Sequence, residues 1–103
     1  MDDHVERMLR VVISNWNAMA MADGEESEPA ADAFQASFYR FIDAVRDWFD
    51  AIEPRPPNFE AMMALPAMLS IAERLPAPLL LNFETEAELI FERKERIEDD
   101  KYD

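Results

Sequence analysis

Residues 34–52 form the stretch FQASFYRFIDAVRDWFDAI, and its apolar spacing decides the fold class. Large apolar side chains recur at alternating steps of four and three residues, at Phe34, Phe38, Phe41, Val45, Trp48 and Ile52. This spacing places them on one side of an α-helix, because the helix completes a turn in about 3.6 residues. We therefore predict a helix over 30–52 that buries this side and ends before Pro54, Pro56 and Pro57.

A similar pattern precedes this stretch. Between residues 3 and 22 the apolar side chains that follow the helical spacing are Val5, Leu9, Val12, Trp16 and Met19. We predict a helix over 3–22 with one broad buried face, capped at its start by Asp2 or Asp3. The acidic segment 23–29 is then expected to be an exposed connector, with Gly24 in the left-handed conformation that often ends a helix.

Two further segments follow the prolines. Asn58 is a good N-cap for a third helix that begins near Phe59. Pro66 lies inside the apolar stretch of that helix and either kinks it or splits it at Leu65, and both outcomes stay open.

The segment 79–103 fits two patterns. Its apolar residues fit a helix that begins at Pro78 or, with Thr85 as a cap, somewhat later. The alternation of apolar and polar residues from Leu81 to Phe91 also fits a strand in a β-hairpin. We expect the helix, because Glu and Ala are poor strand residues.

These segments predict an all-α fold, a small up-and-down bundle of about four helices. The length of 103 residues suits one domain. We expect a single acidic helical domain over 1–98, followed by a frayed tail over 99–103.

Charge limits the classes of partner. The chain has 23 Asp and Glu against 10 Lys and Arg, which gives a formal net charge of −13. Such a charge repels nucleic acid and anionic membranes and favours a protein partner with a basic surface. No apolar run approaches the roughly 20 residues of a membrane span, and acid stands where a signal peptide would be basic. We therefore expect a cytoplasmic protein.

Composition also disfavours catalysis. The chain has no cysteine, one histidine (His4) and one glycine (Gly24). Thiolate zinc sites, nucleophilic centres with a histidine base and glycine-rich phosphate loops are excluded or disfavoured. The inward-facing Glu-x-x-His motif of di-metal helical bundles is missing. We expect no catalytic residue, no metal and no cofactor, so the chain is not expected to be an enzyme.

Acidic residues form the first candidate binding surface. Carboxylates on rigid helices can dock on a basic groove and imitate the phosphates of a nucleic acid, although each one also fits an ordinary solvated helix face. The candidates are Asp43, Asp47, Asp50, Glu53, Glu84, Glu88, Glu92 and Glu95. Arg93, Lys94 and Arg96 would neutralise part of this surface.

Apolar residues form the second candidate. The chain has seven Met and seven Phe, a high count for its length. Met62, Met63 and Met68 lie near Pro66 and are expected to line an adaptable groove, because methionine repacks easily. Core filling is the other interpretation of these methionines.

Two functional hypotheses follow. The first is a non-enzymatic regulator or inhibitor that docks acidic helix faces on a basic protein, with nucleic-acid mimicry as one form of it. Its composition resembles that of phage inhibitors of host defence, immunity proteins and antitoxins, a similarity that rests on no motif. The alternative is a structural or assembly protein of the phage-chaperone kind. It would use apolar Met- and Phe-rich faces, and a homo-oligomer stays open.

Overall fold

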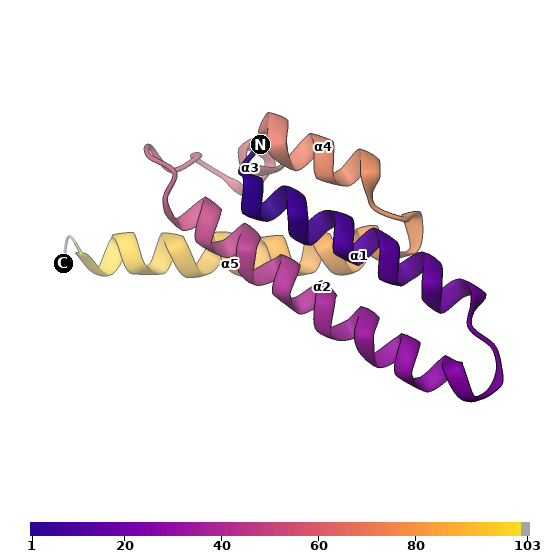
Figure 1. Cartoon of the computed structure of the whole chain (residues 1–103). Helices are drawn as coiled ribbons and strands as arrows, with labels where there is room; N and C mark the ends of the chain where they lie inside the picture. The colour runs from indigo at the N-terminus through magenta and orange to yellow at the C-terminus, as the bar shows by residue number, and fades with distance from the viewer. Residues whose placement is uncertain (102–103) are drawn as a thin grey trace. The chain divides into compact units, whose positions relative to one another are not determined.

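The structure is a computed structural model (Figure 1) that describes the backbone of residues 1–101 and the side chains of residues 1–99. The longer helices are α1 (Asp3–Met21), α2 (Ser27–Asp50), α4 (Pro66–Arg74) and α5 (Leu80–Lys101). The shorter ones are η1 (Gly24–Glu26), α3 (Phe59–Met63) and η2 (Ala77–Leu79). The predicted all-α class is confirmed. The β-hairpin alternative for 79–92 is wrong, because α5 occupies that segment and residues 1–101 contain no strand.

The chain divides into two compact units, Met1–Val45 and Arg46–Asp103. The boundary between them falls inside α2, which is one uninterrupted helix from Ser27 to Asp50. The first unit therefore holds α1 and most of α2, and the second holds the last turn of α2 and everything after it.

In the first unit, α1 and α2 form an antiparallel hairpin (Figure 1). The side chain of Asp2 caps α1 by accepting hydrogen bonds from the backbone N–H groups of His4, at 2.9 Å, and Val5, at 3.1 Å. The Trp16 and Phe34 rings meet edge to face, with centroids 5.4 Å apart, so the predicted apolar faces of the two helices do meet. The buried apolar residues of this unit are Val5, Leu9, Val12, Phe38, Phe41, Ile42, Ala44 and Val45.

The connector between α1 and α2 is shorter than predicted. Gly24 has the expected left-handed conformation, with φ of +58°, and it lies two residues after the C-cap Ala22. However, α2 begins at Ser27 and not at residue 30, so the last part of the predicted connector is helical. Pro29 does not prevent this, because the first N–H groups of a helix have no acceptor within the helix and proline lacks only that group.

In the second unit, the proline-rich segment 51–58 leads to α3. The Asn58 side chain accepts a hydrogen bond from the Ala61 N–H at 2.8 Å, which confirms the predicted N-cap. Pro66 splits the third helix and does not kink it. Leu65 is extended, with φ −60° and ψ 141°, and Pro66 is the first residue of α4. This is the conformation that a proline imposes on the residue before it.

Helix α5 begins at Leu80, and Pro78 belongs to the preceding turn η2. Thr85 does not cap the helix, because its hydroxyl donates to the Leu81 carbonyl within α5 at 2.9 Å. The side of α5 that carries Phe83, Ala87 and Ile90 is buried. The helix includes residues 99–101 of the expected tail, and residues 102–103 lie outside the described part of the chain.

Among the described residues, we find no helix with the length and apolar character that crossing a membrane requires.

Replacing Phe41 with alanine should lower the free energy of unfolding by about 3–5 kcal/mol, because its ring is fully buried. The measurement is a urea unfolding curve, in which the midpoint should fall while the slope stays unchanged. Tyr39→Ala is the control, since Tyr39 lies on the same helix with half of its surface exposed and should cost less than about 1.5 kcal/mol. Equal midpoints for Phe41→Ala and the unmodified protein would show that the Phe41 ring contributes no core packing.

Candidate functional site

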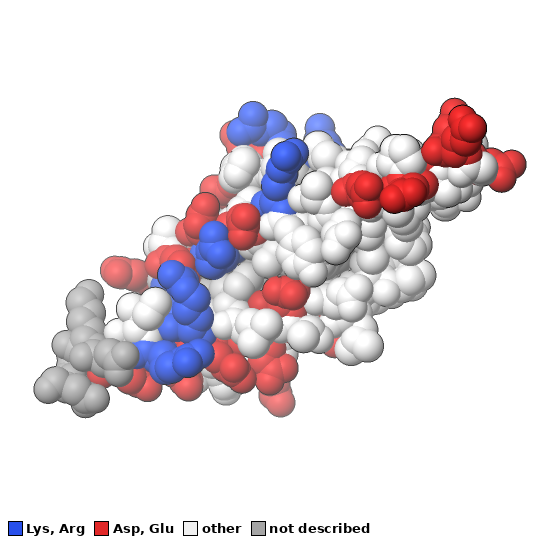
Figure 2. Space-filling model, turned by 90° about the horizontal axis from the view of Figure 1, so that it is seen from below, with Lys and Arg blue, Asp and Glu red and all other residues white. Residues whose placement is uncertain are grey.

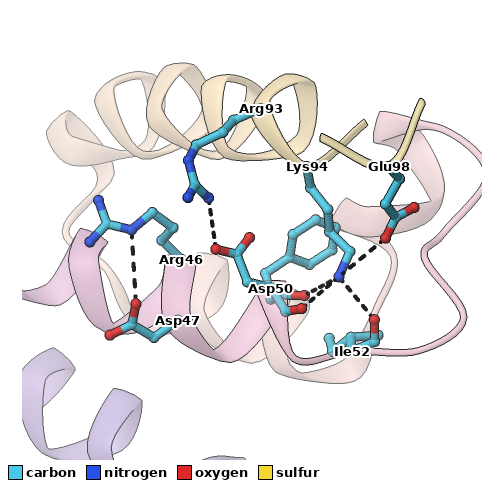
Figure 3. A network of polar contacts seen from close by, with 8 residues as sticks. Arg46, Asp47, Asp50, Ile52, Arg93, Lys94 and Glu98 are labelled. Carbon is cyan, nitrogen blue, oxygen red and sulfur yellow. Dashed lines mark hydrogen bonds and ion pairs between the residues drawn. The ribbon is translucent and has the colours of Figure 1, made fainter. Parts of the chain in front are cut away.

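Lys94 joins α5 to the C-terminal end of α2 (Figure 3). Its ammonium nitrogen donates hydrogen bonds to the backbone carbonyl oxygens of Phe49, Asp50 and Ile52, at 3.1, 2.8 and 3.0 Å. An ammonium group has three N–H donors, and the last carbonyl groups of a helix have no N–H donor from the next helical turn. One side chain therefore satisfies the end of α2 and fixes α5 beside it.

The environment of Lys94 accounts for its burial. Only 5% of the residue is exposed, and its Nζ lies 5.4 Å from the centroid of the Phe49 ring. The Glu98 carboxylate lies 3.7 Å from Nζ, and the negative end of the α2 dipole faces the ammonium. A buried charge is tolerated when it is paired and hydrogen-bonded, as this one is. From the sequence we expected Lys94 only to neutralise part of the acidic surface, and we did not assign it this role.

Two arginines add further links to α5. Arg93 Nη1 lies 2.7 Å from Asp50 Oδ2 (Figure 3), and Arg55 Nε lies 3.4 Å from Glu98 Oε2. The Arg55 guanidinium also lies over the Phe91 ring, 5.9 Å from its centroid. These contacts attach the last turn of α2 and the proline-rich segment to the second half of α5.

The candidate acids of α2 are partly neutralised. Asp50 pairs with Arg93, and Asp47 lies 3.9 Å from the guanidinium of Arg46. Asp43 and Glu53 are exposed, Asp43 in the first unit and Glu53 in the proline-rich segment of the second. Two of these four candidates, Asp47 and Asp50, are therefore not available as uncompensated carboxylates.

The candidate acids of α5 do share a face. Glu84, Glu88, Glu92 and Glu95 follow one another at steps of four, four and three residues, within an arc of about 80° around the helix. The first three are exposed and Glu95 is half-buried. Among residues 1–99, whose side chains are described, none of the four forms an ion pair with Lys or Arg. We call this set the α5 acidic stripe.

An open groove of about 430 Å³ adjoins the stripe. It is lined by Phe59, Glu60, Met63, Ala64, Leu69 and Glu84. These residues come from α3, α4 and α5 and the residue after α3, so all of them belong to the second unit. We call it the α3–α4 groove. Glu84 belongs to both features, which makes the groove and the stripe one continuous surface.

The three candidate methionines have different positions. Met62 and Met68 are fully buried, as expected for core filling. Met63 is half-buried and lines the α3–α4 groove. Of the three, only Met63 is accessible to a partner in this structure.

A second acidic region lies at the tip of the α1–α2 hairpin, and sequence reasoning did not select it. No Lys or Arg occurs between residues 11 and 39, whereas this stretch holds Asp23, Glu25, Glu26, Glu28 and Asp32. Figure 2 shows red side chains without blue ones at this end of the first unit. The absence of Lys and Arg from this stretch is the sequence feature that could have identified the region.

Within the described residues, no group of three or more acidic, His or Cys side chains could hold a metal ion.

Comparison with models of known families, with curated proteins and with solved structures finds no match for this chain. Its function is therefore inferred from its own residues and their geometry.

Replacing Lys94 with methionine should lower the free energy of unfolding by about 2–4 kcal/mol, because the carbonyl groups at the end of α2 lose a charged donor. Arg93→Met is the matched control. Its ion pair with Asp50 is partly exposed to solvent and should be worth less than about 1 kcal/mol. Thermal or urea unfolding of both variants measures the difference. If Arg93→Met proves as costly as Lys94→Met, the carbonyl contacts do not stabilise the second unit.

Proposed function

We propose that the chain is a cytoplasmic, non-enzymatic regulator or inhibitor that binds a protein with a basic surface. The observation that carries this proposal is the α5 acidic stripe, in which four carboxylates share one helix face without an ion pair among the described side chains. Carboxylates that are not already paired can form new ion pairs with a partner at no cost of breaking old ones.

The geometry of the stripe supports docking. From Glu84 to Glu95 it spans about 16 Å along α5, and successive stripe positions are separated by about 4.5–6 Å along the axis. Lys94 and Arg93 hold this helix to the end of α2, so the carboxylates start from a rigid backbone. A preorganised surface loses less conformational entropy when it binds, which favours affinity.

Nucleic-acid mimicry is one form of this function. A partner that uses its basic groove for DNA or RNA would be blocked while the stripe occupies that groove, as in inhibitors, immunity proteins and antitoxins that act by occlusion. A competition experiment with an identified partner tests this form. Added nucleic acid should displace the chain if the chain occupies the partner's nucleic-acid groove, and should not displace it if the chain binds another surface of the partner.

A second candidate function is that of a structural or assembly protein with an apolar interface. Among the described side chains of the second unit, the large apolar ones that are at least half exposed are Leu69, Leu81, Leu89 and Ile97. Their exposure favours an interface, but a net charge of −13 opposes close approach of two copies. Light scattering separates the candidates, because a stable homo-oligomer at low salt favours assembly and a monomer favours the regulator.

Neutralising the stripe tests the proposed function. The variant carries Glu84→Gln, Glu88→Gln, Glu92→Gln and Glu95→Gln, and both it and the unmodified chain are immobilised and exposed to a lysate of the native host. We expect the unmodified chain alone to retain a basic protein. That complex should dissociate between about 0.1 M and 1 M salt, as the Debye length falls from about 10 Å to about 3 Å.

The matched control removes four acids from the hairpin tip, with Asp23→Asn, Glu25→Gln, Glu26→Gln and Asp32→Asn, so that both variants lose the same charge. The control should retain the partner. Loss of the partner from the control alone would place binding at the hairpin tip, and a complex that resists high salt would refute an electrostatic docking surface.

A further inference from the structure

The α3–α4 groove combines an apolar lining with an acidic rim. Phe59, Met63 and Leu69 supply large apolar side chains, and 51% of Leu69 is exposed. An apolar surface of this kind gains free energy when another apolar group displaces its water. The volume of about 430 Å³ lies at the lower end of the range for binding pockets, about 300–1,000 Å³, which suits one or two side chains.

The rim determines the charge of the occupant. Glu60 and Glu84 both line the groove, and neither forms an ion pair within the described side chains. An anionic ligand would meet like charge at close range, whereas an apolar group with positive charges beside it would fit both the lining and the rim.

We propose that the α3–α4 groove receives a large apolar side chain of a basic amphipathic helix, whose Lys or Arg residues pair with Glu60, Glu84 and the rest of the α5 acidic stripe. This inference rests on the proposed function, because it specifies the chemistry of the partner that the stripe binds. The groove binds the apolar side chain of the partner helix, and the stripe orients that helix. This division of roles is common in helix-in-groove recognition.

The groove and the stripe form one continuous surface, which favours a partner helix over an isolated side chain as the ligand. Glu84 lies in the groove, and the stripe runs from it to Glu95 over about 16 Å, which equals about three turns of a partner helix. A helix with its apolar anchor in the groove can therefore place basic residues of successive turns along α5.

Charge argues against a second copy of this chain as the occupant. Each copy has a net charge of −13, and the rim itself is acidic. Anionic membranes are disfavoured for the same reason. Met63 forms part of the wall, and its unbranched side chain can adapt to several apolar anchors, so the groove selects a class of helix and not one sequence.

The test uses the full chain and a fluorescein-labelled peptide of about 18 residues, made of lysine and leucine. Its leucines are spaced i, i+3, i+4 and i+7, so that it forms a basic amphipathic helix. A scrambled peptide of the same composition keeps the charge and loses the apolar face. Fluorescence anisotropy should show that the amphipathic peptide binds at least about tenfold more tightly than the scrambled one.

Leu69→Ser removes an apolar wall of the groove and should weaken binding of the amphipathic peptide about tenfold. Leu81→Ser is the matched control, because Leu81 is 72% exposed and is not one of the groove residues, and it should bind like the unmodified chain. Both positions are largely exposed, so both variants should fold, which unfolding curves verify.

The outcomes separate this inference from the proposed function. If the amphipathic and scrambled peptides bind equally, or Leu69→Ser has no effect, while the stripe variant binds weakly, the groove proposal is overturned and the acidic docking surface stands. If the stripe variant also binds like the unmodified chain, both proposals fail. A concentration-dependent dimer that Leu69→Ser abolishes would assign the groove to a second copy and overturn the helix proposal.

Discussion

The contact of Lys94 with the end of α2 is the interaction on which the second unit depends. Three carbonyl oxygens, the Phe49 ring and the Glu98 carboxylate surround one ammonium group. Without it, the Asp50 and Ile52 carbonyl groups would lose a charged donor, and the Phe49 carbonyl would keep only its bond from the Ile52 N–H. The same contact fixes the part of α5 that carries the acidic stripe, so a structural interaction also positions the surface that we propose for binding.

The cations of the second unit explain which acids remain available. Arg93, Arg46 and Arg55 pair with Asp50, Asp47 and Glu98, and all three of these acids lie near the junction of α2 and α5. The stripe faces another side of α5 and keeps its charge. The excess of acid is therefore not spread evenly. Among residues 1–99, the basic residues neutralise acids near the junction of α2 and α5, whereas the stripe and the hairpin tip form no ion pair with Lys or Arg.

Sequence reasoning was most successful where one physical rule acted alone. The spacing of Val5, Leu9 and Phe41 predicted buried helix faces, and Asn58 predicted a cap, because helical pitch and local hydrogen bonding are short-range properties. It was ambiguous or wrong where two rules competed. Whether Pro66 kinks or splits the helix depends on the backbone conformation of Leu65, which the sequence does not reveal. The segment 79–92 fitted both the helical and the strand spacing of apolar residues. The Arg93–Asp50 and Arg55–Glu98 pairs and the contribution of Glu84 to the α3–α4 groove join residues far apart in the sequence, so no local pattern could reveal them.

The split at Pro66 has a consequence for how this surface could evolve. The α3–α4 groove is lined by residues on both sides of the break between α3 and α4, and Pro66 with the extended Leu65 before it produces that break. The residues that line the groove can therefore be substituted while the break between the two helices is kept. Descendants of this chain that kept the proline could exchange Met63 or Leu69 and so change which ligands the proposed site accepts, while the backbone break is inherited.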